Sequence, residues 1–141
     1  MTLADIRPAL RAFLLADNAI SQAVGSNRIY PEVMPQGEQR PSAVYNLISE
    51  VNDHHMQGAS GLVMQRIQID CWATRPDDAD NLARLIKGRL DGFRGVMGGG
   101  GSPDAGVRVM GAFADVARSR HESEPELFGI ERDFLVWFAE R

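Results

Sequence analysis

The side chains best suited to metal or acid–base chemistry are the three histidines. His54 and His55 are adjacent and follow Asp53, whereas His121 lies far along the chain. Adjacent residues on a strand or loop point in different directions, and no His-x-x-x-His or Cys-x-x-Cys spacing accompanies the pair. The pattern predicts a solvated polar loop and no metal site. A small metal-dependent hydrolase that uses these four residues is the alternative.

The single cysteine, Cys71, is the candidate thiol nucleophile. A nucleophilic thiolate must be exposed and needs a base beside it. Cys71 instead alternates with Ile67 and Ile69, which is the spacing of side chains on one face of a strand. We therefore expect a buried thiol that fills core space. One cysteine also excludes an intramolecular disulfide.

A glycine-rich run that begins at Gly95, with the sequence GVMGGGGSP, could in principle cradle a phosphate group. Phosphate-binding loops lead from a strand into a helix and end in Gly-Lys-Ser/Thr. This run follows a predicted helix and lacks that ending, so residues 92–106 are interpreted as a flexible connector. Neither Gly-x-Ser-x-Gly nor Ser-x-x-Lys occurs in the chain. The sequence predicts no catalytic residue, no metal and no cofactor.

Two segments with apolar residues at spacings of three and four predict the helices that would position these side chains. In the N-terminal segment Thr2 and Asp5 look like a capping box. Asp17 then looks like the cap of a second, shorter turn. The clearest helix covers 76–91, with Thr74 as its cap, acidic residues in its first turn and basic residues in its second half.

Alternation of apolar and polar residues predicts the strands. The third long strand is expected to place Val107, Val109 and Phe113 on one face. The order of the elements predicts an α+β fold, a single domain over 1–141. Its mostly antiparallel or mixed sheet of four to five strands has the N-terminal helix and the central helix packed on one face. The predicted strands are 28–30, 42–50, 62–73, 107–117 and 127–138.

Two tryptophans, Trp72 and Trp137, occupy otherwise polar faces of their strands. If both helices cover the opposite face, these rings lie near the surface, where large rings often anchor protein interfaces. The alternative is that a helix or loop of the same chain covers them.

The segment 51–61 joins two predicted strands and is longer than the two to five residues of an ordinary hairpin connection. Met56 is an adaptable apolar residue in its middle, flanked by Asp53, His54 and His55. We expect an arm that contacts a neighbouring subunit or another partner. An idle loop is the alternative.

The chain of 141 residues is 44% hydrophobic and 24% charged, as is usual for globular domains, and its length predicts one domain. The net charge of −4 provides no basic field for phosphate backbones. The polar strand faces offer Arg66 and Trp72 but also the acidic residues Asp70, Glu131 and Asp133, so they do not predict an RNA-binding sheet. No stretch approaches the roughly 20 apolar residues of a membrane helix. The best candidate for a signal-peptide core, 12–16, is too short.

The whole pattern resembles the tail completion, or tail terminator, family of long-tailed bacteriophages and phage-like particles such as gene transfer agents. The resemblance rests on the order and spacing of three segments across nearly the whole chain. They are LADIRPALRAFLLADNAISQAVGSNRIYPEVMPQGEQRPSAVYNLIS, VMQRIQIDCWATRPDDADNLARLIKGRLDGFRG and ESEPELFGIERDFLVWFAE. The glycine run and the His54–His55 pair are not part of the family pattern.

The resemblance implies a structural virion protein that is not an enzyme. Such proteins form a hexameric ring at the head-proximal end of the tail tube, where they stop tube polymerisation and join the tail to the head connector. The implied partners are further copies of the chain, the major tail tube protein and the head-tail connector or adaptor. DNA only passes through the lumen, and no membrane is involved. The implied location is the neck of a particle assembled in the bacterial cytoplasm. A neck adaptor or tail-tube protein of similar fold is the alternative.

Overall fold

The computed structural model describes residues 3–35, 41–101, 105–123 and 126–140. Within these residues the chain forms helices α1 to α3, strands β1 to β6 and one short 3-10 turn. In chain order they are α1 (Ile6–Leu15), α2 (Asn18–Ala23), β1 (Ile29–Pro31), β2 (Ser42–His55), β3 (Gly58–Ala73), α3 (Pro76–Leu90), β4 (Gly95–Met97), the 3-10 turn (Gly99–Gly101), β5 (Val107–Ser123) and β6 (Glu126–Ala139).

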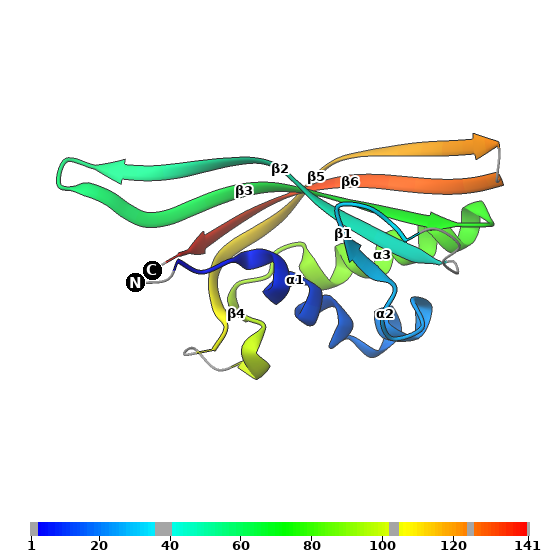
Figure 1. Cartoon of the computed structure of the whole chain (residues 1–141), viewed down its shortest axis with the longest axis horizontal. Helices are drawn as coiled ribbons and strands as arrows, with labels where there is room; N and C mark the ends of the chain where they lie inside the picture. Colours follow the sequence, from blue (N-terminus) through cyan, green and yellow to red (C-terminus); the bar gives the residue numbers. More distant parts are fainter. Residues whose placement is uncertain (1–2, 36–40, 102–104, 124–125, 141) are drawn as a thin grey trace.

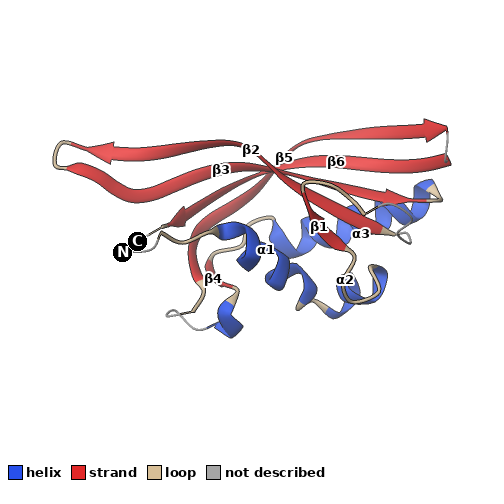
Figure 2. Cartoon of the chain, viewed as in Figure 1, coloured by secondary structure: helices blue, strands red, loops and turns tan. Residues whose placement is uncertain are grey.

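The strands form one mixed sheet in the order β1-β2-β3-β6-β5-β4 (Figure 2). β1 pairs in parallel with β2, and all other neighbouring strands are antiparallel. The two long hairpins, β2–β3 and β5–β6, are joined through pairing of β3 with β6. Because β3 and β6 are antiparallel, the tips of the hairpins point to opposite ends of the molecule (Figure 1). The predicted α+β class is confirmed, and β4 is a sixth strand beyond the four to five expected.

The helices cover one face of the sheet, and the hydrophobic core lies between these two layers (Figure 1). The predicted alternation in 62–73 and 127–138 is confirmed, because the apolar sets of both strands face the helices. Cys71 is buried in this layer, as expected. The helices contribute the apolar stripe that the three- and four-residue spacing predicted. Core side chains from both layers include Ile6, Leu10, Leu14, Leu82, Ile86, Leu90, Val63, Ile67, Ile69, Phe134, Val136 and Phe138.

Aspartates fix the start of both N-terminal helices. The Asp5 carboxylate accepts a hydrogen bond from the backbone N–H of Arg7 at 3.1 Å, so Asp5 itself is the N-cap of α1. Thr2, the predicted cap, lies outside the described residues. Asp17 caps α2 as predicted, accepting from two backbone N–H groups of its first turn.

Helix α3 begins at Pro76 without a side-chain cap. Arg75 occupies the N-cap position and makes no capping hydrogen bond, so the predicted cap by Thr74 is wrong. Proline in the first turn and two aspartates beside the positive end of the helix dipole stabilise this start instead.

No helix within the described residues is long and apolar enough to cross a membrane.

Both hairpins are longer than the alternation predicted. The strands continue through the segment 51–61, where His54 pairs with Ala59 and His55 with Gly58, leaving a turn at Met56 and Gln57. Residues 118–123, beyond the predicted strand 107–117, likewise belong to β5. The residues of these extensions are exposed and mostly polar, so apolar and polar residues do not alternate there. For this reason the sequence does not reveal where the strands end.

A β-bulge overturns the predicted face of Phe113. Val109 pairs with Phe138, but the next pair is Gly111 with Trp137, so one residue of β5 is extra. The shift turns Phe113 to the face away from the helices, where it is 50% exposed.

The predicted connector over 92–106 is wrong in its first part, because β4 pairs with β5 there. Gly98 has a φ of +75°, and a Cβ at this position would lie 2.9 Å from the Cα of Ala9 in α1. Close approach to a helix, in addition to flexibility, therefore explains a glycine here.

Candidate functional site

The sheet face opposite the helices, called the open face here, carries a charged centre. The guanidinium of Arg66 on β3 donates to the carboxylate of Asp115 at 2.7 Å and to that of Asp133 at 3.0 Å. These hydrogen bonds raise the pKa of Arg66. Asp115 lies at the bulge of β5 and Asp133 on β6, so one arginine links three strands across the open face.

A second group of polar residues continues this centre along β6. Glu131 is buried and forms ion pairs with Arg120 at 2.6 Å and Arg118 at 3.4 Å. Asp70 on β3 is also buried, and it accepts a hydrogen bond from the side chain of Gln68 at 2.8 Å. Burial raises the pKa of Asp70. The charged side chains of this centre therefore have their ion-pair and hydrogen-bond partners within the same subunit.

One end of the open face is apolar. Val51, Met64, Trp137 and Gly111 lie side by side on four neighbouring strands. The ring of Phe113 lies against Gly111, since a Cβ on that glycine would be 2.9 Å from the ring. Val51 is 55%, Phe113 50% and Trp137 36% exposed. A group of large apolar side chains at the surface is typical of a protein interface.

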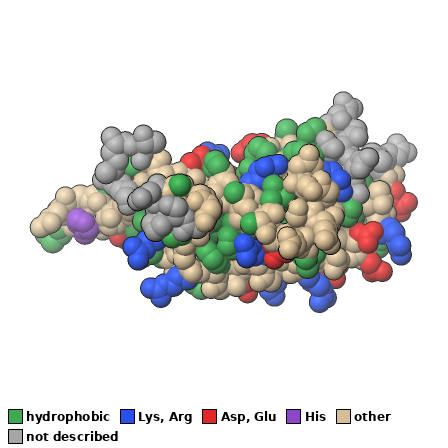
Figure 3. All heavy atoms as spheres, turned by 90° about the horizontal axis from the view of Figure 1, so that it is seen from below, with side chains coloured by type: hydrophobic (Ala, Val, Ile, Leu, Met, Phe, Trp, Pro, Cys, Tyr) green, Lys and Arg blue, Asp and Glu red, His purple; other side chains and the backbone are tan. Residues whose placement is uncertain are grey.

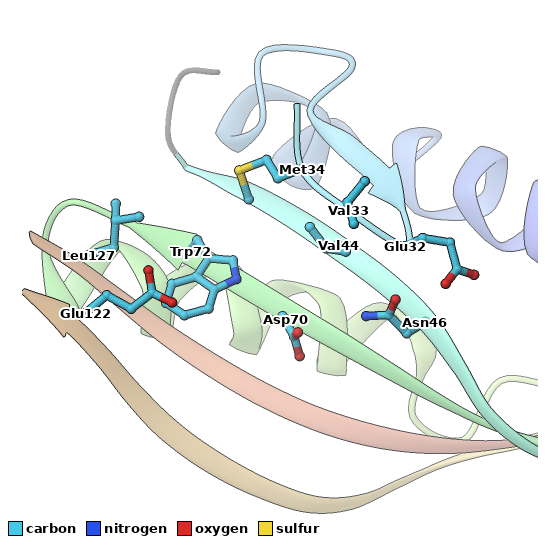
Figure 4. A pocket seen from close by; sticks show the side chains of 9 residues that line it. All are labelled: Glu32, Val33, Met34, Val44, Asn46, Asp70, Trp72, Glu122 and Leu127. Carbon is cyan, nitrogen blue, oxygen red and sulfur yellow. The ribbon is translucent and has the colours of Figure 1, made fainter. Parts of the chain in front are cut away.

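The other end of the open face holds a pocket of about 270 Å³. It lies between the start of β2, the end of β3, the β5–β6 hairpin and the residues after β1 (Figure 4). Trp72 is in its wall, and its ring packs against Gly129, where a Cβ would be 2.8 Å from the ring. The described lining residues are Glu32, Val33, Met34, Val44, Asn46, Asp70, Trp72, Glu122 and Leu127.

The β2–β3 hairpin projects beyond the body as an arm, defined here as residues 48–60, all of which are exposed. Histidine and apolar side chains gather at its tip (Figure 3). Met56 is fully exposed in the turn. Next to it, Nδ1 of His55 accepts a hydrogen bond from the backbone N–H of Gln57 at 3.2 Å. Ser60 donates to the backbone carbonyl of Asp53 at 3.2 Å across the arm.

The predicted interface residues therefore lie in three separate places. Asp53, His54, His55 and Met56 form the arm tip, while Trp72 and Trp137 share the open face but not one site. Trp72 lies opposite Gly129, and Trp137 is eight positions further along β6, about 26 Å of strand. The helices leave both rings on the face away from the core. The pocket is a feature that sequence reasoning missed, although Val44 and Leu127 are apolar residues at open-face positions.

The histidines do not converge. His54 and His55 lie at the tip of one hairpin, whereas His121 lies near the end of the other, stacked on Phe128 at 4.8 Å and 3.6 Å from Glu126. Within the described ranges no group of three His, Cys, Asp or Glu side chains could hold a metal ion.

Exposed apolar side chains and a projecting arm are surface features typical of protein interfaces. Ion pairs join the centre of the sheet, apolar side chains lie exposed at one end, and an arm projects from the body. The family model "Tail completion protein gp17" matches residues 8–139. The chain belongs to this family, which places it among the structural proteins of phage tails.

A solved structure supports the fold. A chain in the structure titled "Virion of native gene transfer agent (GTA) particle" superposes with a TM-score of 0.68 at 20% sequence identity. The match covers 94% of this chain and 92% of that chain. At this identity the likeness concerns the fold alone. The sequence matches none of the curated proteins compared with it.

Proposed function

We propose that the protein forms a ring of six copies at the head-proximal end of a tail tube. There it stops tube polymerisation and joins the tail to the head connector, and DNA passes through the lumen. The observation that carries the proposal is membership of the tail completion family over 8–139. The likeness to a chain of a gene transfer agent virion agrees with a location in the particle.

The arrangement of the surface favours contacts between different faces of neighbouring copies. The two hairpins point to opposite ends, so one copy offers unlike surfaces at its two ends (Figure 1). Within the described residues β1 covers only 43–45 of the outer edge of β2, and β4 covers only 107–109 of β5. Unpaired edges and exposed apolar groups at unlike ends allow heterologous contacts, which produce a ring when the rotation closes.

The proposed role needs no catalysis. The residues that a metal-dependent hydrolase would use, Asp53, His54, His55 and His121, lie on two hairpins that point apart. The net charge of −4 suits a lumen through which DNA slides, because a strongly basic wall would hold the phosphates. Elemental analysis of protein purified without chelator is expected to find no stoichiometric zinc, iron or manganese. One metal per chain that is lost in a His54→Ala/His55→Ala variant would support the hydrolase instead.

Native mass spectrometry of the free protein and of protein released from tail tubes tests the ring. Six copies of the 15.5 kDa chain give a species of about 93 kDa. A ring that forms only on the tube agrees with the proposal, because a bound partner stabilises weak subunit contacts. A protein that is monomeric in both settings contradicts it.

A further inference from the structure

The arm tip and the open-face pocket lie at opposite ends of the subunit. The tip includes the end of β2 and the turn before β3, whereas Trp72 in the pocket lies near the other end of β3. The strand between Gly58 and Trp72 spans about 46 Å at 3.3 Å per residue. The tip of one chain therefore cannot enter its own pocket, and any contact between the two joins separate copies head to tail.

The pocket combines an apolar wall with acidic side chains. Val44, Trp72 and Leu127 provide buried or partly buried apolar surface, and the Sδ of Met34 accepts a hydrogen bond from Ser42 at 3.1 Å (Figure 4). The charged residues among the described lining are all carboxylates, namely Glu32, Asp70 and Glu122, and the Arg120 guanidinium lies 5.7 Å from the centre of the Trp72 ring. Such a pocket suits an apolar side chain that has hydrogen-bond donors next to it.

The arm tip has the complementary chemistry. Met56 is fully exposed at the turn, and methionine fills irregular apolar space and packs well against aromatic rings. Because Nδ1 of His55 accepts a hydrogen bond from Gln57, the neutral imidazole carries its proton on Nε2. This N–H is a donor for a carboxylate acceptor. His54 adds a second imidazole to the arm tip, on the residue that pairs with Ala59.

We propose that Met56 of one copy inserts into the open-face pocket of the next copy and packs against Trp72. In this contact the Nε2–H of His55 donates to a carboxylate of the pocket. The docking rests on the proposed ring and specifies how neighbouring subunits are linked. Every copy has one tip and one pocket. The contact therefore repeats around a closed ring in which every pocket holds the tip of a neighbour.

Cross-linking with a short bismaleimide tests the contact in assembled rings, free or on tail tubes. Val33 lines the pocket and is 74% exposed, so a Met56→Cys/Val33→Cys variant places one thiol at the tip and one at the pocket. The expected result is a ladder from dimer to hexamer on a denaturing gel, because every chain is linked to two neighbours. Each single-cysteine variant has one reactive thiol per chain and is expected to stop at dimers.

Two controls separate this contact from chance collisions. The parent protein reports on Cys71, whose buried thiol has a raised pKa and is expected to remain unreacted. A Met56→Cys/Arg84→Cys variant places the second thiol on the exposed side of α3, on the other face of the sheet, and is expected to give no ladder. A ladder in this control equal to that of the Val33 variant contradicts the proposal.

Substitution of Met56 gives an independent measurement. Met56→Glu places a charge in an apolar, acidic pocket and is expected to weaken subunit association at least tenfold, whereas Met56→Leu keeps it. Rings that form without a ladder, equal association of the Met56→Glu variant, or cross-linking of the tip to the tube protein would each overturn the docking and leave the ring intact. Absence of rings in the parent protein contradicts the proposed function and the docking with it.

Discussion

A variant without the arm tip tests whether the tip is needed for assembly but not for folding. Ser60 donates to the backbone carbonyl of Asp53, so these two residues lie opposite each other on the arm. An Asn-Gly turn that replaces 54–59 therefore joins strand ends that are already close, in the two-residue geometry that Asn-Gly favours. The variant loses His54, His55 and Met56 and keeps the rest of the arm.

The expected cost in stability is small. All six deleted residues are exposed, so the core loses no side chain. Two cross-strand pairs disappear, His54 with Ala59 and His55 with Gly58, each with a contribution of about 0.2–1 kcal/mol. The free energy of unfolding should fall by about 1 kcal/mol at most, since the new turn offsets part of the loss. For a chain of this length that is a fall of about 4 °C or less in Tm.

The assay compares Tm by circular dichroism at a dilution where light scattering shows monomers, because association would itself raise Tm. Ring formation is then measured at higher concentration and on tail tubes, where the variant is expected to fail and Met56→Leu to assemble. A tip-deleted variant that assembles as the parent does refutes the arm's role in docking. A fall in Tm of more than about 10 °C refutes the view that the tip contributes little to the fold.

Three substitutions test other parts of the account. Phe134→Ala should lower the free energy of unfolding by about 3–5 kcal/mol, because the ring is fully buried between sheet and helices; denaturant unfolding that shows under 1 kcal/mol contradicts this. Gly129→Ala places a Cβ 2.8 Å from the Trp72 ring and should cost about 1–3 kcal/mol while shifting tryptophan emission; unchanged emission argues against the contact. Burial raises the pKa of Asp70, so its charged form destabilises the fold as pH rises through that raised pKa. Asp70→Asn should be at least as stable as the parent at pH 7 in urea unfolding, with a flatter dependence at acidic pH, and a clear loss at pH 7 contradicts this reasoning.

Local sequence patterns predicted the layers of the fold well. In β3 the set of Val63, Ile67, Ile69 and Cys71 is buried and the alternate set lies on the open face, because side chains alternate strictly along an unbroken strand. The same rule failed in β5, where a bulge inserts one residue and turns Phe113 outward. A bulge leaves no mark on apolar alternation that a single sequence would reveal.

Features that depend on distant contacts were beyond prediction from the sequence. The arm's strands are held by cross-strand hydrogen bonds in a polar stretch, so their pattern resembles that of a loop. Gly98 indicated flexibility in the sequence, whereas its neighbour Ala9 belongs to a helix far along the chain. The pocket likewise joins residues from four separate segments. Candidate residues Trp72, Trp137 and Met56 were found as single surface anchors, but their places at different ends of the subunit required the topology.

The most direct test of the central claim is a three-dimensional reconstruction of the neck of the particle that contains this protein, by electron microscopy. The proposed function predicts one ring of six copies at the head-proximal end of the tail tube, between the tube and the head connector. The arm of each copy is expected to reach the next. Density for this chain repeated along the tube, or a position away from the head-proximal end, would contradict the account.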